Sequence, residues 1–226
     1  PYIISIPLIA TALIFLWKFK EPQLHKAEVS EPVFKHIRQT FAAVLRNPVL
    51  VPVVVATIGF AVLQEFIFEL GQLWFIAVAA PVALYGVFNA AVFSSWITGG
   101  LLAKRIKSKP AIISLMCMTV AMVILLIASR HYILVLVAQV LIAVCLIAIG
   151  IIFAKKMHDE LPSRLRAGSS SVISTIARII IIPGSLLVTG IAQAYDMSIA
   201  TYILLGVAVI SVTAFMLIKS IKEKTS

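Results

Sequence analysis

Two carboxylates inside an apolar stretch are the residues of this sequence with the clearest potential for chemistry. Glu65, Glu69 and Gln72 are spaced i, i+4 and i+7, so they share one face of a helix. If that helix begins at Asn47 and Pro48, an N-cap followed by a first-turn proline, Glu65 lies about 26 Å along it. A carboxyl group removed from water favours its protonated form and could load and release a proton. The alternative is that both glutamates lie near a membrane surface, simply solvated.

A second polar group of residues lies further along the chain. At 100° per residue, seven polar side chains fall within an arc of roughly 80°: Ser171, Ser174, Thr175, Arg178, Ser185, Thr189 and Gln193. Hydroxyl groups can simply bond back to their own helix, but that does not explain an arginine and a glutamine on the same line. The stripe predicts a cavity-lining face. Arg178 could pair with a carboxylate, hold an anionic substrate or extend its stem to the membrane interface.

Two further features accompany these groups. Tyr85, Asn89, Trp96 and Gly100 share a helix face, which would suit an organic substrate stacking on aromatic rings. Gln139 is an isolated amide in another apolar stretch, and we place it with the substrate- or proton-handling residues.

Small residues and a proline mark expected packing features. Gly86, Ala90 and Ser94 recur every four positions and predict a close approach of two helices, next to Gly99 and Gly100. The Pro183-Gly184 pair predicts a kink.

Composition places these residues in a membrane protein. Of 226 residues, 62% are hydrophobic and only 12% are charged, about half the charge of a typical soluble domain. A transmembrane helix needs about 20 apolar residues. We predict an all-α bundle with seven spans, at 2–17, 49–77, 82–103, 112–129, 132–154, 168–194 and 198–218.

The basic residues predict the orientation of this bundle. Seventeen of the 19 Lys and Arg residues fall on one side if there are seven spans, in the segments 18–46, 104–109, 155–166 and 219–224. That side, including the C-terminus, is expected to lie on the cytoplasmic side of a cell membrane. The net charge of +10 therefore reflects membrane topology and not a nucleic-acid partner.

The spans divide the chain into four parts. Residues 1–17 are expected to end an N-terminal half that is absent from this sequence, because the chain begins at Pro1 inside an apolar run. Residues 18–47 form a cytoplasmic linker with an amphipathic helix around 32–45 on the membrane surface, or, as a weaker alternative, a calmodulin-type target. Residues 48–219 form a six-helix transmembrane domain, and 220–226 a cytoplasmic tail.

Enzyme chemistry is not expected. No His, Asp and Glu metal cluster and no Ser and His nucleophile pair falls in the spans, and His131 and His158 are placed in loops. Cys117 and Cys145 lie in apolar runs without zinc or redox spacing and act as small hydrophobic residues. We predict no metal site, no cofactor and no catalytic residue.

Three segments carry a resemblance to a known family. They are 99–109 (GGLLAKRIKSK), 160–169 (ELPSRLRAGS) and 19–22 (FKEP). They resemble a glycine-basic loop, the loop entering the eleventh helix and the start of the central linker of major facilitator superfamily transporters. The chain is similar to the C-terminal part of that family, helices six to twelve. The spans with amide or charged side chains (the second, third, fifth and sixth) match the family's cavity helices, and the other three match its peripheral helices.

The resemblance implies a function and partners. It implies a secondary transporter that moves a small organic solute, a drug or a metabolite, by alternating access, with a substrate site between two six-helix halves near the midplane. Gly100, Lys104, Arg105, Arg164 and Arg166 would belong to cytoplasmic gating loops, although the first of these loops lacks the family's acidic residue. The expected partners are lipid, the solute, protons and the N-terminal half. The alternatives are a non-transporting scaffold or sensor and, third, an intramembrane enzyme.

Overall fold

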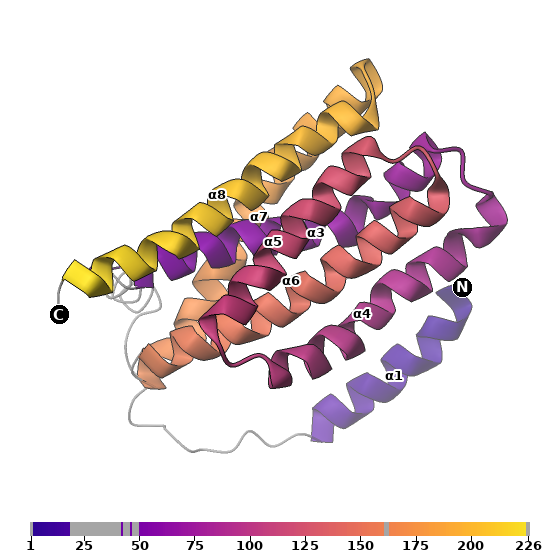
Figure 1. The fold of residues 1–226 in the computed structure, drawn as a ribbon. Helices are drawn as coiled ribbons and strands as arrows, with labels where there is room; N and C mark the ends of the chain where they lie inside the picture. Colours follow the sequence, from indigo (N-terminus) through magenta and orange to yellow (C-terminus); the bar gives the residue numbers. More distant parts are fainter. Residues whose placement is uncertain (1, 19–41, 43–45, 47–49, 161–162, 225–226) are drawn as a thin grey trace. The chain divides into compact units, whose positions relative to one another are not determined.

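The computed structural model describes residues 2–18, 42, 46, 50–160 and 163–224. The described chain is helical and contains no strand, which confirms the all-α prediction. Its elements are α1 (Tyr2–Lys18), α3 (Leu50–Ala77), a 3₁₀ turn η1 (Val82–Leu84), α4 (Tyr85–Arg105), α5 (Lys109–Ala128), α6 (Tyr132–Glu160), α7 (Ser163–Ala194) and α8 (Met197–Lys224) (Figure 1).

Six helices, α3 to α8, are long and apolar enough to cross a membrane, with η1 extending α4. The chain is therefore a multi-pass membrane protein. Most predicted boundaries fall within a few residues of these helices, but α6 and α8 each continue about two turns beyond the expected end. The extra residues are mostly Lys, Glu and other good helix formers, which extend a helix beyond its apolar run.

The first predicted span, 2–17, corresponds to α1. This helix has 17 residues, fewer than the about 20 that a span needs, and belongs to a separate compact unit, Pro1–Lys35. The predicted linker helix at 32–45 lies outside the described residues except for Ala42, and the same holds for Asn47 and Pro48.

Helices α3 and α6 form the centre of the six-helix unit. They contact each other, and between them they contact every other helix of the unit. Helices α5 and α8 contact each other and pack on the central pair, α5 on α6 and α8 on α3. Helices α4 and α7 also pack on the central pair but, in the described chain, do not contact each other.

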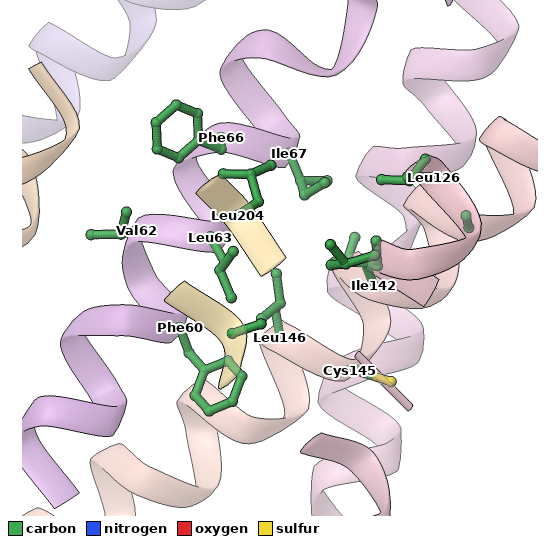
Figure 2. Packing of buried hydrophobic residues seen from close by; sticks show 14 of the residues in the cluster. Phe60, Val62, Leu63, Phe66, Ile67, Leu126, Ile142, Cys145, Leu146 and Leu204 are labelled. Atoms are coloured by element: carbon green, nitrogen blue, oxygen red, sulfur yellow. The ribbon is translucent and has the colours of Figure 1, made fainter. Parts of the chain in front are cut away.

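The contacts of α3 and α6 with each other and with α5 and α8 are here called the dry seam. Figure 2 shows part of it, where Phe60, Leu63 and Ile67 of α3 lie near Ile142 and Leu146 of α6. Phe153 is fully buried, with ring centroids 6.3 Å from Phe60 and 5.1 Å from Phe215 of α8. Because lipid tails are as apolar as these side chains, close van der Waals packing stabilises the seam.

Two buried polar side chains of the dry seam form hydrogen bonds between helices. Trp74 Nε1 of α3 donates to Thr201 Oγ1 of α8 at 3.0 Å, and Thr201 in turn donates to the carbonyl of Met197. Gln139 of α6 is fully buried and donates through Nε2 to the carbonyl oxygen of Gly71 at 2.9 Å. These bonds join α3 to α8 and to α6.

The prediction of close packing through Gly86, Ala90 and Ser94 is wrong for the described chain, because all three are exposed. The close approach of α4 to α6 occurs at Gly99, where a Cβ would lie 2.8 Å from the carbonyl oxygen of Val144. This glycine lies on the face of α4 that carries its buried apolar residues, and that face determines the contact.

Helix α7 continues through Pro183 as one helix. Beside the proline, Gly184 leaves room for the ring of Phe66 on α3, since a Cβ at Gly184 would lie 3.3 Å from Phe66 Cζ.

At the end of the unit where α5 meets α6, Arg130 joins two loops. Its Nη1 lies 3.0 Å from Asp196 Oδ2, in the connection from α7 to α8, and 2.6 Å from Ser198 Oγ, in the first turn of α8. Burial alone would raise the pKa of Asp196. The backbone N–H of Ser198 and the Arg130 guanidinium outweigh that effect and hold the pKa below its ordinary value.

Candidate functional site

A cleft opens between α3, α4 and α7, in the space that results because α4 and α7 do not contact each other. Its volume is about 240 Å³. It is lined by side chains of all three helices: Gln64, Glu65, Phe68 and Glu69 from α3, Phe93 and Trp96 from α4, and Arg178 from α7.

The lining residues of α3 follow from helical spacing. Glu65 and Glu69 are separated by one turn, as are Gln64 and Phe68, so the four form two adjacent rows. The neighbouring faces of α3 carry Leu63, Phe66 and Ile67, which are buried in the packed interior. Packing of those faces turns the polar rows toward the cleft.

An ion pair crosses the cleft from α3 to α7. Arg178 Nη2 lies 3.2 Å from Glu65 Oε1, and the two side chains are 64% and 25% exposed. Of the alternatives open for Arg178, the structure shows the pairing with a carboxylate. Isolated charges are costly inside a membrane, and pairing lowers that cost for both helices.

Aromatic rings form the wall opposite Arg178. Phe68 lies at the centre, with ring centroids 5.3 Å from Phe93 and 5.8 Å from Trp96. Trp96 and Phe93 are spaced i, i+3 on α4 and remain more than half exposed. The cleft therefore combines two carboxylates, one guanidinium and a wall of three tilted aromatic rings.

The structure brings together only some of the predicted site residues. Glu65, Glu69, Trp96 and Arg178 line the same cleft. Gln72 and Asn89 do not line it; Gln72 is exposed and Asn89 is half-buried.

Two further predicted residues pack elsewhere. Tyr85 lies with its ring centroid 6.2 Å from that of Phe75. Gln139 is buried against the backbone of Gly71, outside the cleft.

The polar stripe of α7, predicted to line a cavity, is exposed or half-buried along its whole length, and of its members only Arg178 lines the cleft. Hydroxyl groups of the stripe bond back to the helix. Thr175 donates to the carbonyl of Ser171 at 2.8 Å, Ser185 donates to that of Ile182 at 2.8 Å, and Thr189 bonds to that of Ser185. Back-bonding therefore accounts for these hydroxyls, and the arginine has a different role.

Three lining residues were not predicted. Gln64, Phe68 and Phe93 lie next to predicted ones, and Phe68 follows Glu65 by three residues and precedes Glu69 by one. That spacing was the available signal, since a residue at i+3 shares the face of Glu65.

The predicted gating residues occupy helix ends. Lys104 and Arg105 are exposed in the last turn of α4, where cations are stabilised by the helix dipole, and Gly100 is half-buried with open space at its Cβ position. The prediction that 160–169 forms a loop is wrong, because Arg164 and Arg166 lie within α7.

His158, predicted in a loop, also lies in a helix, in the last turn of α6, and its Nε2 lies 3.2 Å from Ser170 Oγ.

Metal binding has no candidate in the part of the chain that the structure describes, where no three His, Cys, Asp or Glu side chains are grouped to hold an ion. In comparisons with known proteins, no family model, no curated protein and no solved structure matches this chain. The cleft is therefore interpreted from its own residues.

Proposed function

We propose that this chain forms part of a secondary transporter that moves a small organic solute across a membrane by alternating access, coupled to protons through Glu65. The observation that carries the proposal is the Glu65–Arg178 ion pair, which joins two apolar helices at the edge of an open cleft. Charged residues within membrane spans mark substrate and ion pathways far more often than structural sites.

The ion pair supplies a coupling step that these residues can perform. When a proton adds to a carboxylate oxygen of Glu65, the side chain loses its charge and its attraction for Arg178. Helix α7 would then be held to α3 by apolar packing alone, including the contact of Phe66 at Gly184. Protonation would thus bias the position of α7, the kind of two-state element that alternating access needs.

The architecture supports the same proposal. Two helices, α4 and α7, flank the cleft without closing it, while α5 and α8 close the opposite side. In the major facilitator superfamily, which the chain resembles, a second six-helix half would face such a cleft. We propose membership of that family, with the basic helix ends and the C-terminus on the cytoplasmic side of the cell membrane.

A reconstitution experiment tests the proposal. Full-length protein is placed in proteoliposomes that contain the pH dye pyranine, and a panel of organic cations, anions and zwitterions is added in turn. Solute-dependent proton movement is expected for at least one of them in the wild type. Glu65→Gln should abolish it, since the amide cannot carry the proton.

Asp159→Asn is the matched control, because it removes a carboxylate from the exposed end of α6 away from the cleft. It should behave as wild type. Solute movement by Glu65→Gln with unchanged pH dependence would refute the role of Glu65. Absence of flux for every solute with the folded wild type would favour the alternative, a non-transporting scaffold or sensor.

A further inference from the structure

The charges of the cleft do not balance. Two carboxylates, Glu65 and Glu69, line it together with one guanidinium, that of Arg178, which pairs with Glu65. Glu69 is exposed, and within the described residues it has no basic partner. With both carboxylates ionised, the cleft therefore carries one net negative charge. Inside a membrane such a charge attracts a cation more strongly than it would in water.

The aromatic wall suits the same kind of ligand. The face of an aromatic ring attracts a cation, most strongly for tryptophan, and Trp96 belongs to the wall together with Phe68 and Phe93. Phe68 precedes Glu69 directly on α3, so ring and carboxylate belong to the same stretch of the cleft. Rings offer no oxygen ligands, which disfavours a bare metal cation.

We propose that the solute handled by this cleft is a monovalent organic cation with a compact aromatic body. Its charge would lie near Glu69 and its ring against Phe68, Phe93 and Trp96, while Glu65 stays paired with Arg178. A volume of about 240 Å³ fits a body of one or two rings. This inference rests on the proposed function only in treating the bound ligand as the transported solute.

Matched probes separate charge from shape. Three probes have similar size but different charge. N-methylquinolinium is a cation, 2-methylquinoline is neutral at pH 8, and quinoline-2-carboxylate is an anion. Their binding to full-length protein in nanodiscs is measured by equilibrium dialysis, with empty nanodiscs subtracted. The cation should bind at least about tenfold more tightly than the neutral probe. The anion should show no measurable binding. Equal binding of cation and neutral probe, or tighter binding of the anion, would overturn the proposal.

Two variants, Glu69→Gln and Trp96→Phe, locate the site, and a third, Asp159→Asn, is the control. Glu69→Gln should weaken binding of N-methylquinolinium about tenfold and leave the neutral probe unchanged, which also shows that the variant is folded. Asp159→Asn removes the same charge outside the cleft and should change neither. The cation should also quench tryptophan fluorescence in the wild type and much less in Trp96→Phe. Unchanged cation affinity in Glu69→Gln, or the same loss in Asp159→Asn, would contradict the assignment.

Flux separates this inference from the proposed function. Saturable binding of the cation without any flux in proteoliposomes would refute transport and leave the cation site standing. Proton-coupled flux of quinoline-2-carboxylate but not of N-methylquinolinium would refute the cation and leave transport standing.

Discussion

The two sides of the central helices differ in how they treat polar groups. In the dry seam, Trp74 and Gln139 each donate to a partner on another helix and are buried there. In the cleft, Glu65 has a partner but remains partly exposed, and Glu69 has none in the described chain. Helix α3 takes part in both regions, one face packing and another lining open space.

The comparison of the dry seam with the cleft shows that a polar residue in an apolar helix has two distinct uses. A neutral amide or indole can join two helices with one hydrogen bond and needs no solvent. A carboxylate retains a requirement for water or a counter-charge, so it lies where helices leave a gap. Residue type therefore distinguishes the seam from the cleft better than the presence of polarity alone.

The largest effect on stability is expected from Phe153→Ala in the dry seam. The side chain is fully buried between Phe60 and Phe215, so its loss leaves a cavity. We expect a loss near the low end of about 3–5 kcal/mol, because part of the transfer free energy vanishes in lipid. Unfolding in mixed micelles measures it. Trp96→Ala, on the exposed cleft wall, should cost less than half as much; an equal cost would contradict the distinction.

An intermediate effect is expected for the ion pair of the cleft. A double-mutant cycle of Glu65→Gln and Arg178→Gln should give a coupling free energy of about 1 kcal/mol, since Arg178 is largely exposed. The same unfolding assay in mixed micelles measures it. A coupling of zero would mean that the pair does not hold α3 to α7, and the proposed coupling step would fail with it.

A smaller effect is expected from Gln139→Leu. The substitution removes the hydrogen bond to Gly71 but also removes Oε1, a buried acceptor without a partner in the described chain. These two effects oppose each other, so stability should change by less than about 1 kcal/mol. Transport should be retained, because Gln139 lies outside the cleft. Loss of transport in this folded variant would restore Gln139 to the substrate-handling residues.

The smallest effect is expected from Asp196→Asn, in the connection between α7 and α8. The pKa of Asp196 is held below its ordinary value in the folded state, so its contribution is present above that ordinary value and is lost as pH falls through the lowered one. Because the pair with Arg130 is solvated, we expect less than about 0.5 kcal/mol at pH 7. Thermal unfolding of variant and wild type should converge at low pH; a constant difference would exclude the charge as the cause.

Sequence reasoning predicted the helices and part of the cleft for one reason: apolar run length and helical periodicity are local properties. They placed Glu65 and Glu69 on one polar helix face and Arg178 on another, and the structure shows that these three residues line the same cleft. They could not place Gln139, because an amide that lines water and one that bonds a neighbouring backbone look alike in sequence. The small-residue spacing of Gly86 failed similarly, since packing depends on which face of α4 meets α6, and that face contains Gly99.

The proposed transport requires that the cleft contain water, and thiol accessibility tests this directly. Phe93 lines the cleft and is 55% exposed, whereas Ile210 on α8 is 64% exposed and does not line the cleft. Each is changed to cysteine in a background with Cys117→Ala and Cys145→Ala, in the full-length protein in membranes. A membrane-impermeant thiol reagent requires the ionised thiolate, which forms only in water. We expect rapid labelling of Phe93→Cys and none of Ile210→Cys; equal resistance of both to labelling would mean that the cleft faces lipid.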